Sequence, residues 1–329
     1  MSAITTPILS RTPQLRPLNI LRDLSSVANL VEKCFADTLD ESGRRYIEEM
    51  RNVGQNSAFL RWANMAAETV SMPLSGYVWE ENGQVIGNVS LIPYRRERMQ
   101  YYLIANVAVF PEHRRRGIGC ALTVAAMEHA RQRNVSDIWL HVRDDNPGAI
   151  SLYRSLGFIE LAHRTQWQAK PDRNASADGL GVSISDRHSG DWLQQEPWLQ
   201  RLYPPLLTWY QPMPLLSLRP GLGPWLYRFM VDHEVRHWVA RMNGAPTAML
   251  SCLAVAGQNE RLWVAVPPQG SERPLTALLL YARRALAWRQ TITLDFPAGE
   301  YQASIEAAGF RPYRTLLWMK LQPSDSVHL

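Results

Sequence analysis

Apolar and polar residues alternate with periods that predict a series of strands and helices in the first half of the chain. From Leu24 to Phe35 the apolar residues recur every three or four positions, which predicts a helix with one buried face, capped by Asp23. Two β-rich runs, 76–79 and 85–91, flank Asn82-Gly83, a dipeptide typical of a tight hairpin turn.

A second group of elements follows this hairpin. A long β-rich run extends from Tyr101 to Phe110, and apolar residues at helical spacing then predict a helix from Ile118 to His129. A strand over 138–142, a short helix over 146–155 and a strand over 158–167 complete the series. This alternation predicts a mixed sheet with helices on both faces.

Three landmarks occur twice in the same order, which predicts an internal duplication. They are a turn (Asn82-Gly83 and Asn243-Gly244), a strand end (107–109 and 264–266) and a Gly-Phe pair (157–158 and 309–310), separated by 161, 157 and 152 residues. The polar, breaker-rich stretch 170–179 is typical of a linker. We therefore expect an α/β (α+β) protein of two domains, 1–171 and 172–329, each a mixed, mostly antiparallel twisted sheet flanked by helices.

Composition narrows the classes of protein that fit. With 329 residues, 46% of them hydrophobic and 20% charged, the chain can bury two cores. The net charge of +5 comes mainly from scattered arginines without a long basic run, which argues against nucleic-acid binding. No long apolar segment or secretory pattern is present, so we expect a cytoplasmic protein without a membrane partner. Three widely spaced cysteines predict neither a disulfide framework nor a metal site.

The segment between the strand ending at Phe110 and the helix beginning near Ile118 predicts an anion site. A strand-to-helix turn presents unpaired backbone amides at the positive end of the helix dipole. Gly117 and Gly119 lack the Cβ atoms that would keep a phosphate away from these amides. The alternative is a solvated arginine cluster on an ordinary loop.

Two motifs resemble the GNAT N-acetyltransferase superfamily. Arg114-Arg115-Arg116-Gly117-Ile118-Gly119 matches its acetyl-CoA loop, [RQ]xxGx[GA]. Asn146–Phe158 matches its second motif, N-x-x-A-x-x-L-Y-x-x-x-G-F, and the 27 residues from Gly119 to Asn146 suit an intervening helix and strand. The resemblance covers about residues 15–168, and the second half only in outline.

The resemblance implies two GNAT-like domains and transfer of an acetyl group from acetyl-CoA to an amine of a small molecule or a protein N-terminus. It implies that the strand before the loop splays from its neighbour to hold the pantetheine arm, that the amides of residues 115–120 hold the pyrophosphate, and that Tyr153 donates a proton to the leaving thiolate. The implied acetyl-CoA contacts are Val107, Ala108, Val109, Arg114, Arg115, Arg116, Gly117, Ile118, Gly119, Cys120, Asn146, Ala149 and Tyr153. A packed, noncatalytic Tyr153 is the alternative.

The general base is open at this point. Leu140-His141-Val142-Arg143 resembles the Leu-Glu-Val-Arg strand of ribosomal-protein N-terminal acetyltransferases, with histidine in place of their glutamate. His141 has a suitable intrinsic pKa, and Glu80, Glu81 or Glu97 could act through water. Cys120 could instead form an acyl-enzyme, but the absence of an accompanying base favours a small packed residue.

The second half resembles a degenerate copy of the first. Its counterpart of the anion loop, 266–275, contains Glu272 and Pro274, which would repel phosphate and remove an amide donor, and its counterpart of Tyr153 falls near Ser304 or Ile305. We expect it to support the first domain and to shape the acceptor site together with residues 36–75 and aromatic residues between 192 and 227. A noncatalytic acyl-CoA-binding regulator or scaffold is the alternative function. The sequence does not indicate an oligomeric state.

Overall fold

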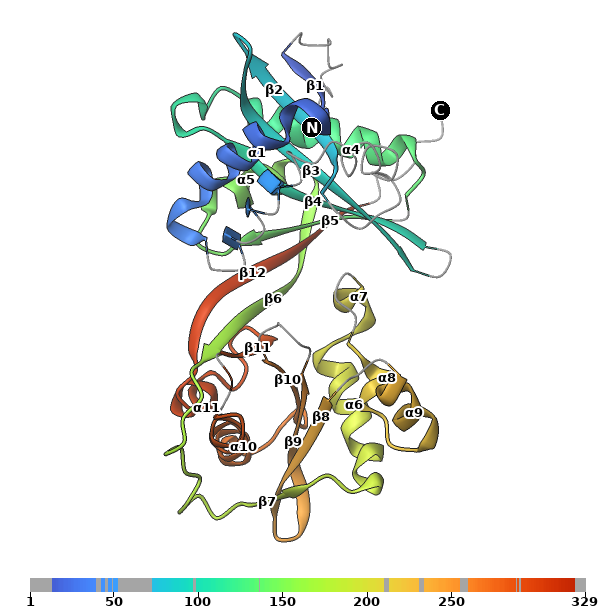
Figure 1. Cartoon of the computed structure of the whole chain (residues 1–329), viewed down its shortest axis with the longest axis vertical. Coiled ribbons are helices and arrows are strands. Elements are labelled where there is room, and N and C mark those ends of the chain that lie inside the picture. The colour runs from blue at the N-terminus through green and yellow to red at the C-terminus, as the bar shows by residue number, and fades with distance from the viewer. Residues whose placement is uncertain are drawn as a thin grey trace, which may run out of the picture. The chain divides into compact units, whose positions relative to one another are not determined.

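The fold is taken from a computed structural model, in which the chain forms two compact units. It describes residues 14–39, 43–44, 47–48, 50–52, 73–96, 99–135, 137–209, 213–230, 234–254, 260–287, 289 and 291–322. The first unit comprises 1–142, 146–159 and 319–329, and the second comprises 143–145 and 160–318. Each unit is a mixed, mostly antiparallel sheet with helices, so the predicted fold class is confirmed (Figure 1).

The first unit contains the β4–α4 loop. Its elements are β1 (Leu15–Pro17), α1 (Ile20–Phe35), η1 (Ala36–Thr38), β2 (Ser75–Glu81), β3 (Gln84–Arg96), β4 (Met99–Val109), η2 (Pro111–His113), α4 (Ile118–Gln132), β5 (Asp137–Arg143) and α5 (Pro147–Ser155). The strand order is β1-β2-β3-β4-β5, followed by the end of β12 (Arg311–Leu321). β4 and β5 run parallel and the other neighbours among β1–β4 run antiparallel.

The start of α1 differs from the prediction. Asn19, not Asp23, caps the helix, with its side chain accepting from the Leu21 amide at 3.0 Å. The Asp23 side chain is buried and accepts hydrogen bonds from Arg16 at 2.6 and 2.8 Å. This ion pair holds β1 against the first turn of α1, because an unpaired carboxylate at this depth would be strongly destabilising.

The second unit repeats the order of elements of the first. Its elements are β6 (Phe158–Ala169), β7 (Ser183–Asp186), η3 (Ser189–Asp191), α6 (Trp192–Leu202), α7 (Pro205–Thr208), α8 (Leu215–Leu218), α9 (Leu222–Met230), β8 (Glu234–Met242), β9 (Ala245–Ala254), β10 (Glu260–Ala265), α10 (Glu272–Ala285), β11 (Ile292–Pro297), α11 (Gln302–Ala307) and β12. A hairpin, a strand, a helix, a parallel strand, a helix and a final strand occur in each half. The proline-rich segment 204–224 is divided among the short helices α7 to α9, because proline cannot continue a regular element.

The last strands of the two halves are exchanged. β6, which ends the first half, pairs antiparallel with β11, from Ile292 opposite Ala169 to Pro297 opposite Arg164. The end of β12 lies beside β5, where Lys320 pairs with Asp137 at 2.6 Å and the Gln322 amide donates to the Gly157 carbonyl at 3.1 Å. Because of this exchange, the compact units differ from a division at residue 172: β6 belongs mainly to the second unit and 319–329 to the first.

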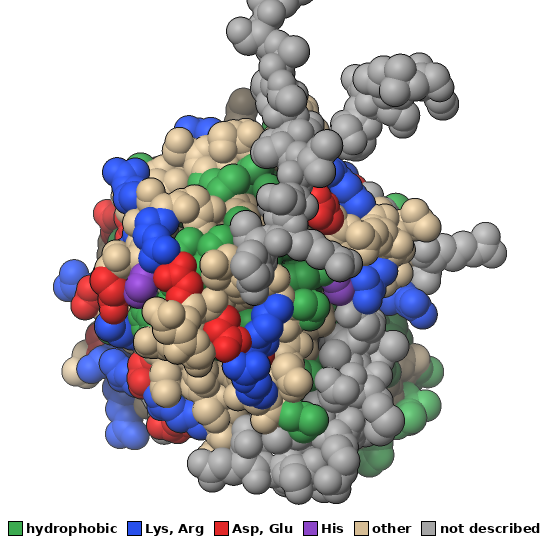
Figure 2. All heavy atoms as spheres, turned by 90° about the horizontal axis from the view of Figure 1, so that it is seen from above, with side chains coloured by type: hydrophobic (Ala, Val, Ile, Leu, Met, Phe, Trp, Pro, Cys, Tyr) green, Lys and Arg blue, Asp and Glu red, His purple; other side chains and the backbone are tan. Residues whose placement is uncertain are grey.

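Several surface arginines of the first unit form ion pairs with carboxylates. Arg22 pairs with Glu80 at 2.5 Å and Arg116 with Glu81 at 2.7 Å. Figure 2 shows one face of the molecule, on which basic and acidic side chains of the described residues are interspersed. Within the described part of the chain, no helix has both the length and the apolar character needed to cross a membrane.

Candidate active site

A β-bulge in β4 shapes the centre of the first unit. Asn88 and Ser90 of β3 pair with Ala108 and Ala105 of β4, so one residue of β3 lies opposite two residues of β4. Asn106, in the bulge, has φ +50°, a left-handed conformation that asparagine tolerates better than most residues. The buried Asn88 side chain donates to the Asn106 carbonyl at 3.0 Å and so holds the bulge in place.

β4 and β5 part directly beyond the bulge. Their parallel pairing runs from Tyr101 opposite Asp137 to Ile104 opposite Leu140 and then ends. Of the following residues of β4, Ala105, Ala108 and Val109 pair with β3, whereas Asn106 and Val107 lie in the bulge, and none of the five pairs with β5. The β5-facing edge of this segment, which includes Val107, Ala108 and Val109, therefore lacks a strand partner among the described residues. An extended ligand can bond to such an edge as an added strand does.

The loop between β4 and α4 presents six consecutive amides, those of residues 115–120. None of the hydrogen bonds of the described residues uses these amides as donors; the first amide bonded into the helix is that of Ala121, which donates to Gly117 at 3.0 Å. Gly117 occupies the cap position of α4 with φ +79°, and no side chain caps the helix. A Cβ at Gly117 would meet nothing within 4 Å, and one at Gly119 would meet only Leu152 at 3.7 Å. The loop therefore combines unpaired donors with open space, which suits a diphosphate.

The three arginines of the loop have different surroundings. The Nε of Arg114 donates to the Val109 carbonyl at 3.0 Å, which holds the loop against the end of β4. Arg116 binds Glu81 at 2.7 and 3.2 Å and His113 at 2.8 Å. The side chain of Arg115 is exposed and has no partner among the described residues. Of the three predicted phosphate contacts, Arg115 is the one whose guanidinium has no partner among the described residues.

The helix α5 carries the second group of predicted residues. Asn146 caps it, and its Oδ1 accepts from the Ala149 amide at 3.1 Å, which leaves the Nδ2 hydrogens available to a ligand. Tyr153 lies two turns further along, buried against Phe158 with ring centroids 6.1 Å apart. Burial raises the pKa of Tyr153 to about 12. The phenol therefore keeps its proton at any physiological pH.

His141 stands where β4 and β5 separate. It follows Leu140, the last β5 residue paired with β4, and its side chain is half-buried. The acidic alternatives are less suited to act as a base. Hydrogen bonds from Arg16 and Arg22 lower the pKa of Glu80, and those from Trp79 and Arg116 lower the pKa of Glu81. Glu97 lies outside the described residues, as do most of residues 36–75.

The comparisons with known proteins agree with this geometry. Residues 32–158, which contain β4, the loop and α5, match the Acetyltransferase (GNAT) family. This part of the chain is a GNAT region. Over its full length the GNAT fold is similar to that of a GCN5-related N-acetyltransferase from Sphaerobacter thermophilus, with a TM-score of 0.57 over 95% of this chain and 98% of that one, at 14% identity.

Two curated acetyltransferases are among the proteins similar in sequence to the chain. The chain is 38% identical over 80 residues to the [ribosomal protein bS18]-alanine N-acetyltransferase of Escherichia coli K12, which covers 24% of this chain and 54% of that protein. It is 31% identical over 160 residues to the mycothiol acetyltransferase of Thermobispora bispora, covering 47% of this chain and 50% of that one. The chain thus spans about half the length of the curated relatives that it matches.

The corresponding GNAT loop of the second unit is filled by protein atoms. The Tyr301 hydroxyl donates to the Pro267 carbonyl at 3.3 Å, and a Cβ added at Gly270 would lie 2.9 Å from Pro267 and 3.1 Å from Tyr301. The amide of Val264, which corresponds to Val107, donates to the buried Tyr203 hydroxyl at 3.2 Å. In the second unit, side chains therefore fill the space of the loop, and the strand amide corresponding to that of Val107 is bonded internally.

Sequence reasoning missed Asn88 as the residue that holds the bulge. The pattern that could have revealed it is the pair of asparagines, Asn88 and Asn106, each inside a run of β-forming residues. A polar side chain there is unfavourable unless it serves a particular hydrogen bond. Among the described residues, no group of three or more His, Cys, Asp or Glu side chains is placed to hold a metal ion.

Proposed function

We propose that the first unit is an acetyl-CoA-dependent N-acetyltransferase that transfers the acetyl group directly to an amine. The observation that carries the proposal is the set of six unpaired amides, at residues 115–120, beside a strand edge that β5 leaves open. These two features suit the two ends of one substrate. A diphosphate needs converging donors, and an amide-containing pantetheine arm needs an extended backbone with which to pair.

The proposed binding mode uses the predicted residues in order along the cofactor. The amides of 115–120 and the free Arg115 hold the diphosphate, and the β4 segment 107–109 pairs with the pantetheine arm. Asn146, through its Nδ2 hydrogens, donates to a carbonyl of the same arm. The open space around Gly117 lets the phosphate oxygens reach the amides.

Transfer then requires one proton acceptor and one proton donor. The amine nitrogen attacks the thioester carbonyl carbon, a C–N bond forms, and the C–S bond breaks. The Tyr153 hydroxyl donates its hydrogen to the departing sulfur, a role that its raised pKa supports because the phenol remains protonated. His141 takes the proton of the amine, directly or through water, from its position where the two strands part.

The acceptor belongs to the class of amines, either a small molecule or a protein N-terminus. The names of the sequence relatives, a ribosomal-protein alanine N-acetyltransferase and a mycothiol acetyltransferase, include both kinds. The second unit does not take part in binding acetyl-CoA, since Tyr301 and Tyr203 occupy the groups that a second molecule would need.

The test combines binding with turnover on the full chain. Isothermal titration calorimetry with CoA is expected to show one site, and a screen of amines with acetyl-CoA is expected to release free thiol. Absence of CoA binding would overturn the proposal. Binding without thiol release from any small amine or N-terminal peptide would favour the noncatalytic regulator instead.

A further inference from the structure

A chain of four hydrogen-bonded side chains lies inside the second unit, far in sequence from the proposed catalytic residues. Arg187 Nη1 donates to Gln195 Oε1 at 2.7 Å, Gln195 Nε2 donates to Ser251 Oγ at 2.9 Å, and Ser251 Oγ lies 2.8 Å from His237 Nδ1. Gln195 and Ser251 are fully buried. Buried polar groups of this kind fix one another's orientation.

The direction of these bonds determines which ring nitrogen of His237 carries the proton. Because a guanidinium can only donate, the Gln195 oxygen faces Arg187 and its NH2 group faces Ser251. Ser251 accepts this bond, and its own hydrogen has no other acceptor among the described residues, so the hydrogen is directed at His237 Nδ1, which then acts as an unprotonated acceptor. Burial, together with the charges of Arg187 and Arg228, lowers the pKa of His237 to about 3. His237 is therefore neutral, with its hydrogen on Nε2.

The arginine that begins the chain has no carboxylate partner among the residues that the structure describes. Its Nη1 also donates to the Leu218 carbonyl at 2.8 Å, while its Nε and Nη2 have no acceptor in that part of the chain. The nearby Asp191 already binds Arg241 through both carboxylate oxygens, at 2.7 and 2.9 Å. Burial and the charge of Arg228 lower the pKa of Arg187 to about 10, which leaves it cationic at neutral pH. Arg187 is thus a cation to which no carboxylate of the described residues is hydrogen-bonded.

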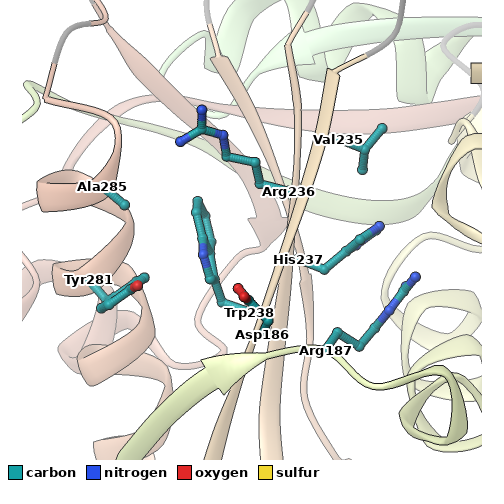
Figure 3. A pocket seen from close by; sticks show the side chains of 8 residues that line it. All are labelled: Asp186, Arg187, Val235, Arg236, His237, Trp238, Tyr281 and Ala285. Atoms are coloured by element: carbon teal, nitrogen blue, oxygen red, sulfur yellow. The ribbon is translucent and has the colours of Figure 1, made fainter. Parts of the chain in front are cut away.

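These donors border a pocket of about 420 Å³ at the edge of the sheet, where β7 ends and β8 continues. Figure 3 shows that His237 and Arg187 project to one side of β8, whereas Arg236 and Trp238 project to the other. Val235 supplies apolar surface beside the two donors. On the side of His237 and Arg187 the lining therefore offers a cation, an N–H donor and an apolar contact, whereas Asp186, a carboxylate of the lining, lies beside Trp238 on the other side (Figure 3).

We propose that this pocket binds a small molecule through an anionic oxygen group, a carboxylate or a phosphate, held by the guanidinium of Arg187 and the Nε2–H of His237. A planar or tetrahedral oxyanion accepts from both donors and pairs with a cation to which no described carboxylate is hydrogen-bonded. The site lies in the second unit, so the proposal does not depend on the acetyltransferase activity of the first.

The test follows His237 directly by NMR of the full chain labelled with ¹⁵N-histidine. The His237 resonances, assigned among the eight histidines by His237→Asn, are expected to show an Nε2–H tautomer. Titration with inorganic phosphate or with acetate is expected to shift them saturably, at constant ionic strength set by sodium chloride. A response to phosphate alone identifies a phosphate ligand, and a response to acetate identifies a carboxylate. Identical spectra with either anion and with chloride would overturn the proposal.

Two substitutions make the result specific. Arg187→Met should weaken the apparent affinity for the responsive anion at least tenfold, since it removes a charge-assisted contact. Arg236→Met is the matched control, because it removes the same charge from the same pocket, one residue from His237, on the opposite face of β8. Equal weakening by both variants would mean general charge attraction and would refute the site. Should Arg187→Met not fold, the wild-type titration still decides the proposal.

Discussion

Gly117→Ala is the sharpest perturbation of the proposed CoA loop. The added Cβ meets no protein atom within 4 Å, so the variant suffers no internal clash. Its stability cost comes from the backbone, because alanine at φ +79° costs about 1–2 kcal/mol. The methyl group, or the relaxation of φ that relieves it, separates the diphosphate from the amides around residue 117. Loss of one or two charge-assisted bonds costs about 2–4 kcal/mol, which is a thirtyfold to several-hundredfold rise in Kd for CoA.

Gly244→Ala is the matched control for this variant. Gly244 lies in the hairpin turn between β8 and β9 of the second unit, with φ +81° and no atom within 4 Å of an added Cβ. It should therefore lose a similar amount of stability and shift Tm by a similar few degrees. Calorimetry with CoA separates the two: only Gly117→Ala should lose affinity.

Two outcomes would refute the reasoning. An unchanged Kd for CoA in Gly117→Ala would mean that the loop amides do not hold the diphosphate. An equal loss of affinity in both variants would mean that the effect arises from reduced stability instead of the loop.

Three further predictions concern catalysis, strand exchange and pH. Tyr153→Phe should lower kcat at least tenfold without changing the Kd for CoA. The kcat of the wild type should not fall between pH 8 and 10, because the pKa of the Tyr153 phenol is about 12. Full turnover in Tyr153→Phe would exclude the role of Tyr153 as the acid. Truncation after Trp318 removes the end of β12 that lies beside β5, including the ion pair of Lys320 with Asp137, and should abolish CoA binding. Truncation after Gln322 keeps these contacts and should leave CoA binding intact. Equal binding of CoA by both truncated proteins would contradict the strand exchange. His237 is neutral when folded and has an ordinary pKa when unfolded, so the free energy of unfolding of the wild type should fall by about 2 kcal/mol between pH 7 and 5. Urea unfolding should show no such fall in His237→Asn, and identical pH dependence of the two proteins would refute the burial of His237 as a neutral histidine.

Local patterns in the sequence determined much of this protein. The helix predicted from Ile118 to His129 extends over Ile118–Gln132, and the short helix predicted over 146–155 is present over Pro147–Ser155, because residue preferences within a few positions determine both. The duplicated landmarks likewise predicted two halves with the same order of elements. These features depend on backbone conformation and short-range periodicity, which a sequence encodes directly.

Only the tertiary structure decided which strands are neighbours and which buried side chains meet. β6 and β12 follow equivalent helices in the two halves, so either could satisfy the edge of β5, and no local pattern distinguishes them. The Asn88 contact that holds the bulge and the series from Arg187 to His237 join residues 8 to 56 positions apart. Such pairings depend on how complete elements pack together, because the free energy of a buried hydrogen bond is set by its surroundings and not by its neighbours in sequence.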